Sequence, residues 1–196
     1  MRIVRAATVF AVVAVMTAGL HAVLSAQQES QRVNAYGAAV KAFRDRTAAY
    51  LLVQKKAAES VPPLKQTDDP AKLNSREVAL GEAIRQLRVG AKAGDIFGAD
   101  LTPHIRRVIS RDWAKRSVAD RAGLAEDIPA NSVTQVNATY PPALPLGTFP
   151  ASLLAALPPL PEQLEYRFVG RHLILRDVAA NIVVDVMLNV IPGART

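Results

Sequence analysis

Six charged or titratable side chains gather in the last part of the chain, in a stretch that predicts adjacent strands. They are Arg167, Arg176, Asp177, Asp185, Glu165 and His172. Carboxylates flanked by arginines can carry out acid–base chemistry or bind an anionic ligand. The structural alternative is a ladder of cross-strand ion pairs that keeps one sheet face solvated, contributing about 0.2–1 kcal/mol per pair. The ladder is favoured, because Glu165 and Arg176 are expected to pair with each other.

A second group of cations lies on an expected helix. Arg107, Arg111 and Lys115 recur every four residues, which places them on one helix face. This stripe is a candidate anion-binding edge, and the alternative is an ordinary solvated face. The remaining basic residues are spread along the chain, and no aromatic-rich exposed face is expected, so nucleic-acid binding is not predicted.

The familiar catalytic and metal-binding motifs are absent from the sequence. The chain has no cysteine and three histidines, His21, His104 and His172, none at metal-ligand spacing. No GxSxG, SxxK, Walker or GxGxxG motif occurs. The sequence therefore predicts no metal, no cofactor and no catalytic residue. A triad assembled only in space, from a serine, a histidine and an aspartate, stays open as an alternative.

Leu164–Leu188 carries the strongest strand signal in the chain. Apolar residues alternate with charged ones at its start, which is the period of a half-buried strand. Gly170-Arg171 suits a two-residue hairpin turn, with Gly in the first central position. Such a turn sets the register of the two strands. The expected pairs are Phe168 with Leu173, Tyr166 with Leu175 and Glu165 with Arg176.

A second turn, Val178 to Asn181, is expected to return the chain as a third strand, Ile182 to Leu188. Pairing Asp177 with Ile182 makes the apolar residues of all three strands share one face. The predicted inward set is Leu164, Tyr166, Phe168, Leu173, Leu175, Val184 and Val186. Asp185 is expected outward, with the other charged residues. A slip of one residue would reverse every assignment, so the pattern predicts a three-stranded antiparallel meander.

Residues 1–26 have the pattern of a secretory signal peptide. Arg2 and Arg5 are followed by an apolar run and by Leu24-Ser25-Ala26, a plausible cleavage site before Gln27. The apolar run is shorter than the roughly 20 residues that a membrane span needs, so we expect cleavage rather than an anchor. The formal charge of the whole chain is +7, and removing the two arginines leaves +5. Such a charge suits an anionic envelope or ordinary solubility.

The mature chain, residues 27–196, is expected to form a single domain whose helical part spans residues 28–125. A long amphipathic helix is predicted over residues 28–59, where apolar residues recur at intervals of three and four. At 1.5 Å per residue it would reach about 45 Å, long enough to project and contact a second copy. Self-association through this helix is therefore one prediction for the partner.

Two further helices are expected. Asp69-Pro70 indicates a helix start, and the second helix is centred on residues 75–93, with Asn74 and Glu77 spaced as a capping box. Gly94 to Gly98 should form a turn that tucks two apolar side chains inward. Thr102-Pro103 is expected to begin the third helix.

Proline dominates the connection to the meander, which is expected over residues 164–190. Residues 141–161 hold seven of the thirteen prolines, which excludes a central strand or a long helix. Leucine, alanine and phenylalanine separate these prolines, as suits a buried strap that crosses the domain. A short helical turn is expected near Phe149–Leu154. Val133 to Tyr140, rich in Val, Thr and Asn, is a candidate fourth strand.

Three parts of the chain resemble a recurring pattern of uncharacterised secreted bacterial proteins. They are LPPLPEQLEYRFVGRHLILRDVAANIVVD, residues 157–185; GDIFGADLTPHIRRVI, residues 94–109; and NATYPPALP, residues 137–145. The resemblance implies an exported domain and no particular chemistry.

Together these patterns predict an α+β domain, with about three helices on the apolar face of a three- to four-stranded antiparallel sheet. The function predicted is a non-catalytic binding module of the periplasm or envelope, whose partner is an unknown protein or envelope component. The alternative is a small hydrolase, or another enzyme acting on an anionic ligand, that uses the arginines and aspartates of the meander.

Overall fold

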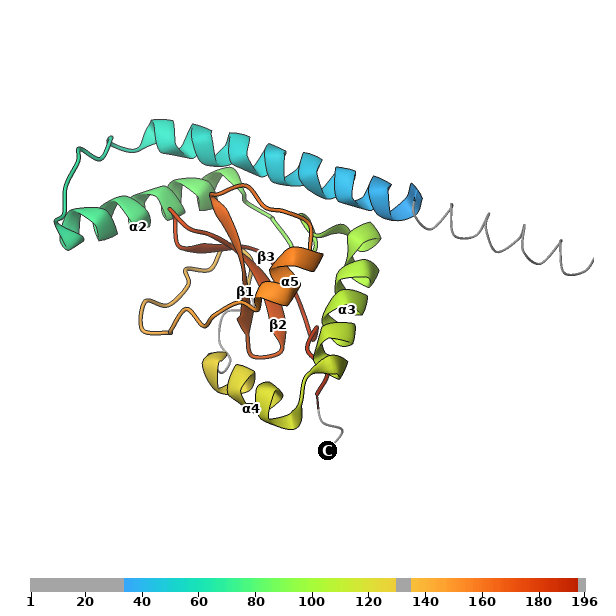
Figure 1. Ribbon diagram of the computed structural model, residues 1–196. Helices are drawn as coiled ribbons and strands as arrows, with labels where there is room; N and C mark the ends of the chain where they lie inside the picture. Colours follow the sequence, from blue (N-terminus) through green and yellow to red (C-terminus); the bar gives the residue numbers. More distant parts are fainter. Residues whose placement is uncertain (1–33, 130–134, 194–196) are drawn as a thin grey trace, which may run out of the picture. The chain divides into compact units, whose positions relative to one another are not determined.

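The structure, a computed structural model, describes residues 34–129 and 135–193. The chain divides into two compact units, Met1–Ala39 and Val40–Thr196, and the packing described below is that of the second unit. Helices and one antiparallel sheet form the predicted α+β fold (Figure 1). The expected signal peptide lies outside the described residues, and self-association through residues 28–59 stays a prediction.

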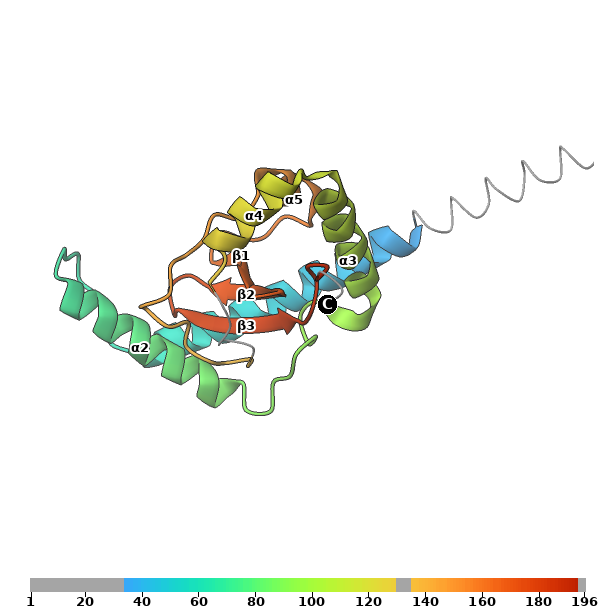
Figure 2. The ribbon, with the colours of Figure 1, turned by 90° about the horizontal axis from the view of Figure 1, so that it is seen from below.

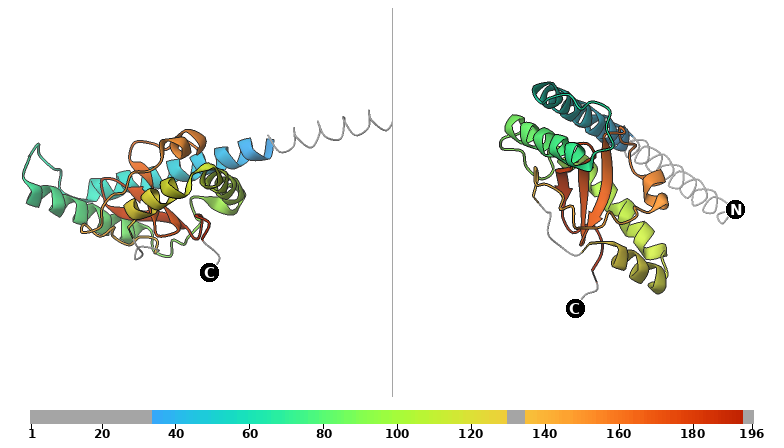
Figure 3. Two further views of the ribbon diagram at one scale, coloured as in Figure 1. Left: turned by 60° about the horizontal axis from the view of Figure 1, so that its bottom comes forward. Right: turned by 90° about the vertical axis from the view of Figure 1, so that its left-hand side faces the viewer.

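The helices precede the sheet in the chain. The described part of the first helix covers residues 34–60. The later helices are α2 (Pro70–Leu87), α3 (Gly98–Lys115), α4 (Val118–Asp127) and α5 (Ala151–Ala156). α5 is the short turn expected within the proline-rich strap, and it packs against α3 (Figure 2). The strands are β1 (Leu164–Val169), β2 (His172–Asp177) and β3 (Ile182–Met187), and they lie in the order β1-β2-β3 (Figure 3).

Helix α2 begins where Asp69-Pro70 indicated. The Asp69 side chain accepts a hydrogen bond from the Ala71 N–H, and Pro70 occupies the first turn, where its missing N–H costs nothing. The capping box predicted at Asn74 and Glu77 is therefore wrong. Those residues lie inside the helix, and Glu77 instead accepts a hydrogen bond from Asn181.

Helix α3 starts earlier than predicted. It begins at Gly98, so Pro103 lies inside the helix and the start expected at Thr102-Pro103 is wrong. The Thr102 hydroxyl donates to the Gly98 carbonyl oxygen at 2.7 Å rather than capping a helix. The earlier start brings Leu101 into the core, where it is fully buried. The turn before α3 buries Ile96 and Phe97, as predicted.

The β1–β2 hairpin has the predicted register. The three predicted pairs are present: Phe168 with Leu173, Tyr166 with Leu175 and Glu165 with Arg176. Gly170 has a φ of 53°, which a residue without a Cβ adopts readily. Local alternation and a two-residue turn are therefore sufficient to specify this hairpin.

The β2–β3 pairing differs from the prediction because β3 contains a β-bulge. Asp177 pairs with Ile182 as expected, but the register shifts between Leu175 and Arg176, and Leu175 then lies opposite Asp185. Val184 is the extra residue, and Arg88 of the segment after α2 donates a hydrogen bond to its carbonyl oxygen at 3.0 Å. A bulge turns all later side chains of its strand to the opposite face.

Three predicted orientations are consequently wrong. Asp185, expected outward, lies on the inward face with Leu175, and Val186, expected inward, lies in an outward cluster with Ile174. Val184 occupies the bulge itself rather than the inward face.

The expected fourth strand, Val133 to Tyr140, is reduced to one bridge in its described part. The Asn137 N–H donates to Val183 of β3, the Tyr140 N–H donates to Asn181 just before β3, and a single bridge joins Thr139 to Ile182. Asn137 has a φ of 68°, which interrupts an extended strand. The side chains of Arg85 and Arg88 bind the Asn137 carbonyl and amide oxygens. Among the described residues the sheet therefore has three strands.

Both faces of the sheet are covered. A row of stacked aromatic rings with neighbouring centroids 4.8–6.4 Å apart runs beneath the inward face. In order, the rings are Phe43, Phe97, Tyr166, Phe149 and Phe168. The outward face carries a second apolar cluster, covered by residues preceding and beginning the strap. Its buried members are Tyr140, Val169, Ile174, Val183 and Val186. The solvated outward face expected from the sequence is therefore not observed.

Candidate functional site

Glu165 is the centre of the charged group on the outward face. Its two carboxylate oxygens accept from different arginines: Oε2 from Arg167 Nη2 at 2.6 Å and Oε1 from Arg176 Nη1 at 2.7 Å. Burial opposes ionisation of Glu165, but the two arginines outweigh it, and the pKa of this carboxyl lies below its ordinary value. The predicted Glu165–Arg176 ion pair is therefore present and extends to Arg167.

Arg176 is further fixed by its neighbours. It is only 8 % exposed, its Nε donates to Asn181 Oδ1 at 2.9 Å, and its guanidinium carbon lies 5.5 Å from the centre of the Tyr140 ring. Asn181 in turn donates to Glu77 of α2 and to the Tyr140 carbonyl oxygen. Arg176 thus has a structural role in joining the sheet to the segment that covers it.

Asp177 lies on the opposite face from Arg176. Its Oδ2 accepts hydrogen bonds from Tyr50 Oη at 2.6 Å and from Gln54 Nε2 at 2.5 Å, and both donors come from the first helix. Its Oδ1 accepts from the Ala180 N–H at 2.8 Å, which stabilises the β2–β3 turn. With three donors and no exposure, this carboxylate fastens the first helix to the sheet.

Asp185 is held by backbone N–H groups. Oδ1 accepts from Gly94 and Val186, and Oδ2 accepts from Ile96 and Phe97, at distances of 2.6–2.8 Å. Burial raises the pKa of this carboxyl above its ordinary value, and the four N–H donors act against that rise. Asp185 therefore organises the turn before α3. An acid–base pair of Asp177 and Asp185 beside the arginines, as the enzyme alternative required, is not assembled on the outward face.

The other predicted candidates do not join this group. His172 Nδ1 accepts from the Asn189 N–H at 2.9 Å, and burial, with the nearby Arg171 charge, lowers the pKa of the imidazole. The three cations of the predicted stripe, Arg107, Arg111 and Lys115, are exposed on α3. They make no hydrogen bond or ion pair with another described residue, so they match an ordinary solvated face as well as an anion-binding edge.

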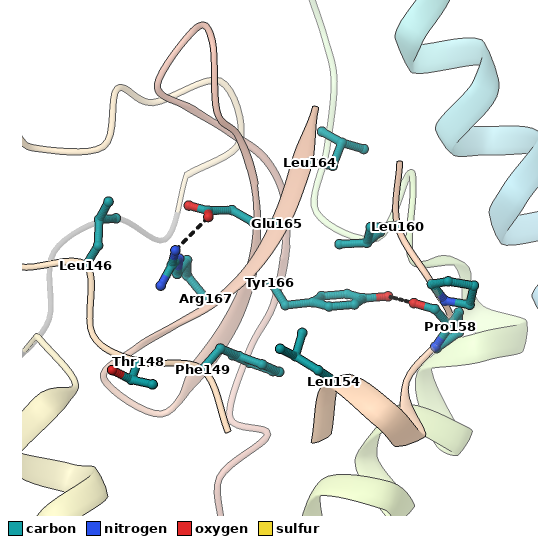
Figure 4. Close-up of a pocket in the computed structure, with 11 residues that line it drawn as sticks. Leu146, Thr148, Phe149, Leu154, Pro158, Leu160, Leu164, Glu165, Tyr166 and Arg167 are labelled. Atoms are coloured by element: carbon teal, nitrogen blue, oxygen red, sulfur yellow. Dashed lines mark hydrogen bonds and ion pairs between the residues drawn. The ribbon is translucent and has the colours of Figure 1, made fainter. Parts of the chain in front are cut away.

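A pocket of about 440 Å³ opens at the outer edge of β1 (Figure 4). Its walls come from both faces of this strand, because successive side chains point to opposite sides. Glu165 and Arg167 line one side of the strand, and Leu164 and Tyr166 line the other. The pocket therefore combines an ion pair with an apolar wall.

The proline-rich strap completes the pocket. It is tied to β1 on each face: Arg167 Nη1 donates to the Gly147 carbonyl oxygen at 2.8 Å, and Tyr166 Oη donates to the Pro158 carbonyl oxygen at 3.0 Å. The strap and α5 supply the remaining lining, which is Leu146, Thr148, Phe149, Leu154, Pro158, Pro159 and Leu160. Leu146 is 47 % exposed and Leu154 is 54 % exposed, so two large apolar side chains beside the pocket face solvent.

One donor in this pocket has no acceptor. Arg167 Nε is buried and makes no hydrogen bond with any described residue. An unpaired buried donor is destabilising, and it favours a ligand or water that offers an oxygen. Of the sequence-predicted candidates, Glu165 and Arg167 therefore lie in a pocket. The strap residues around them were missed as lining, although the alternation of proline with leucine and phenylalanine was the signal available.

Comparisons with known proteins add no relative: no protein-family model, no curated protein and no solved structure matches the chain. Within the described residues, no helix has the length and apolar character needed to cross a membrane. In the same part of the chain, no cluster of three or more His, Asp or Glu residues has the arrangement of a metal site.

Proposed function

We propose that this chain is an exported, non-catalytic binding protein whose ligand occupies the pocket at the edge of β1. The observation that carries this proposal is the unpaired Nε of Arg167, a residue that lines this pocket together with apolar and polar neighbours. A volume of about 440 Å³ falls within the range of about 300–1,000 Å³ that small-molecule sites occupy. Apolar lining with a few polar groups is the usual composition of such sites.

The charges of the pocket indicate the class of ligand. Glu165 lines the pocket and forms a 2.6 Å ion pair with Arg167, so an anionic ligand bound to Arg167 would meet the Glu165 carboxylate beside it. An uncharged molecule avoids that penalty and can still accept a hydrogen bond from the Arg167 guanidinium. The ligand class proposed is therefore a neutral molecule with an apolar body and one carbonyl, ether or hydroxyl oxygen.

Nile red, a neutral dye with apolar rings and a carbonyl oxygen, is a suitable probe. Its fluorescence is titrated with the mature protein and with two leucine variants. Leu154→Asp places a charge in the pocket lining at a half-exposed side chain, whereas Leu52→Asp makes the same change at a 71 % exposed position on the first helix. We expect Leu154→Asp to weaken binding about tenfold and Leu52→Asp to leave it unchanged. If the two variants bind Nile red with equal affinity, the pocket at the β1 edge is not the binding site.

A third variant tests the polar contact. Arg167→Lys keeps the charge near Glu165 but removes Nε and the planar guanidinium. Weaker dye binding with an unchanged melting temperature supports a direct contact with the ligand. Unchanged dye binding would show that Arg167 serves only the ion-pair network.

Export is part of the same proposal, and it rests on the sequence pattern of residues 1–26. The full-length chain is expressed in a bacterium that secretes proteins through signal peptides, and the N-terminus of the recovered protein is sequenced. A periplasmic or extracellular product that begins at Gln27 is the expected result. An uncleaved cytoplasmic product would contradict export.

A further inference from the structure

A second hollow lies between the connector that follows the first helix and the start of α2. It has a volume of about 700 Å³ and is remote in sequence from the meander. Its apolar lining comes from Pro62, Pro63 and Leu64 of the connector and from Ala71 and Ala79 of α2. Small and apolar side chains on both walls leave room for a hydrocarbon chain, and Gln66, Thr67 and Ser75 add uncharged polar groups to the lining.

The charged lining of this hollow has a single sign. Lys65, Lys72 and Arg76 contribute to it, and no acidic side chain does. Asp69 is a counter-charge for Lys72, because its Oδ2 lies 3.5 Å from Lys72 Nζ. Asp69 also caps α2 through its other oxygen. Lys65 and Arg76 form no ion pair with a described residue, so the hollow keeps a positive charge beside its apolar wall.

Arg76 is the most informative of the three cations. Its Nη1 is buried and has no hydrogen-bond partner among the described residues. A buried N–H without an acceptor is unfavourable, and the planar guanidinium of a partly exposed arginine matches the oxygens of a carboxylate or phosphate. Arg76 therefore brings to the wall of the hollow a cation that has no counter-charge among the described residues.

A smaller hollow of about 440 Å³ adjoins the first one. Leu64 and Arg76 line both, and Ala58, Leu73 and Leu80 extend the apolar wall toward the sheet. Glu77 also lines this second hollow. Its carboxylate would repel an anion, so the second hollow suits the uncharged part of a ligand. Because the two hollows share Leu64 and Arg76, a cationic end lies beside a longer apolar wall.

We propose that these two hollows bind a single-chain amphiphile with one anionic head group, such as a long-chain carboxylate. The head group contacts Arg76, Lys65 and Lys72, and the hydrocarbon chain lies along Leu64 and the alanines of the walls. A free amphiphile is favoured over a membrane surface, because the cations line a recess rather than a flat face. This site is independent of the pocket at the β1 edge, which takes an uncharged ligand.

Isothermal titration calorimetry with the mature protein tests the class of ligand. Decanoate is added below its micelle concentration and is compared with decyltrimethylammonium, which reverses the charge, and with inorganic phosphate, which lacks the chain. Saturable binding of decanoate, with neither control binding comparably, is expected. Equal binding of decyltrimethylammonium would overturn the anionic preference. Binding to phosphatidylglycerol vesicles without binding to free decanoate would assign the surface to a membrane and reject the proposal.

Matched variants test the residues. Arg76→Gln removes the unpaired guanidinium, and Arg44→Gln makes the same change at an exposed position outside every hollow described here. Arg76→Gln is expected to weaken decanoate binding about tenfold or more, whereas Arg44→Gln leaves it unchanged. Arg76→Lys should restore part of the affinity. Melting temperatures identify misfolding, and if Arg76→Gln does not fold, Lys65→Gln supplies the test. Wild-type affinity in a folded Arg76→Gln or Lys65→Gln protein would overturn the proposal.

Failure of this proposal is distinguishable from failure of the proposed function. Leu154→Asp alters the β1-edge pocket and should leave decanoate binding intact, whereas Arg76→Gln should leave Nile red binding intact. If Arg76→Gln abolishes dye binding as well, the β1-edge pocket and the hollows lined by Arg76 are not separate sites and the inference is rejected.

Discussion

Tyr50 and Asp177 are 127 positions apart in the sequence, yet the Tyr50 hydroxyl donates a hydrogen bond to Asp177 Oδ2 at 2.6 Å in the core. The contact joins the first helix to the last residue of β2. Both side chains are almost fully buried, with exposed fractions of 3 % and 0 %. A polar pair placed so deeply specifies how the helix sits on the sheet, because any other alignment would leave Asp177 with fewer donors.

Removing the Tyr50 hydroxyl should destabilise the fold. Tyr50→Phe retains the ring and leaves Asp177 with two of its three donors. We expect the free energy of unfolding to fall by about 1–3 kcal/mol, measured by urea denaturation. Tyr36→Phe, the same change at a 37 % exposed ring, is the comparison and should lower stability less than Tyr50→Phe does. Equal effects would show that the buried hydrogen bond contributes nothing specific.

Tyr50 should also make the fold sensitive to alkaline pH. Burial, followed by the Asp177 charge, raises the pKa of Tyr50 far above its ordinary value. The folded state therefore holds this proton more tightly than the unfolded chain does. The stabilisation that this pKa shift contributes is fully present below about pH 10, the pKa of tyrosine in the unfolded chain. It is lost as pH rises above that value. Unfolding free energies of the wild type should decline above that pH more steeply than those of Tyr50→Phe; parallel curves would contradict the assignment.

Asp185 should be essential to the turn before α3. In Asp185→Asn the amide nitrogen replaces one oxygen and faces backbone N–H donors instead of accepting from them. We expect a loss of about 3 kcal/mol or more, measured by chemical denaturation. Asp68→Asn, at an exposed position of the connector, should have little effect. A similarly small effect at both positions would show that the four hydrogen bonds of Asp185 are dispensable.

Glu165 should contribute to the loss of stability at acidic pH. Although burial opposes its ionisation, the hydrogen bonds from Arg167 and Arg176 hold the pKa of Glu165 below its ordinary value. Its stabilisation is therefore present above the unfolded pKa of about 4.3 and is lost as pH falls through the lower folded pKa. Glu165→Gln should lower the free energy of unfolding by about 1–3 kcal/mol at neutral pH. It should also make this free energy fall less steeply as the pH is lowered. If the unfolding free energies of the wild type and of Glu165→Gln fall equally steeply at acidic pH, Glu165 does not contribute to acid sensitivity.

Two glycines in the same turn should differ in their tolerance of alanine. Gly94 and Gly98 both have positive φ angles, 91° and 74°. A Cβ at Gly94 would meet no atom, whereas a Cβ at Gly98 would collide with the Arg46 guanidinium and the Asp100 carboxylate. Arg46 cannot move freely, because it donates to the carbonyl oxygens of residues 96 and 97. Gly94→Ala should cost about 1 kcal/mol.

Gly98→Ala should lower the free energy of unfolding by at least about 1 kcal/mol more than Gly94→Ala does. The reason is that it adds a steric collision to the same backbone strain. Thermal unfolding of the two variants measures the difference. If Gly94→Ala proves the more damaging, the packing of Arg46 against Gly98 does not matter for stability.

The β1–β2 hairpin was predictable because its determinants are close together in the sequence. The alternation around Tyr166 and the two residues Gly170-Arg171 specify which side chains pair, and those pairs are observed. Glu165 and Arg176 were recognised as partners for the same reason. Arg167 was placed correctly beside them, although its role in lining a pocket depends on the strap and was not visible.

The orientation of Asp185 was not predictable in this way. An alternating pattern carries no sign of a bulge, and the pattern around Val184 suits an unbulged strand equally well. The shift is supported by remote contacts: Arg88 binds the Val184 carbonyl oxygen, and the N–H groups before α3 surround Asp185. Pairing rules between adjacent strands contain neither of these groups.

By itself the sequence determined the fold class, the hairpin register and the proline-rich strap, because alternation, turn geometry and the conformational limits of proline act between near neighbours. Only the tertiary structure decided which charges are functional candidates. It buried Asp177 and Asp185 beneath the helices and left Arg167 in a pocket at the β1 edge. It also placed Arg76 in a hollow with no partner among the described residues. Desolvation and hydrogen-bond partners are set by segments that are distant along the chain, so no local pattern reveals which charge remains unpaired.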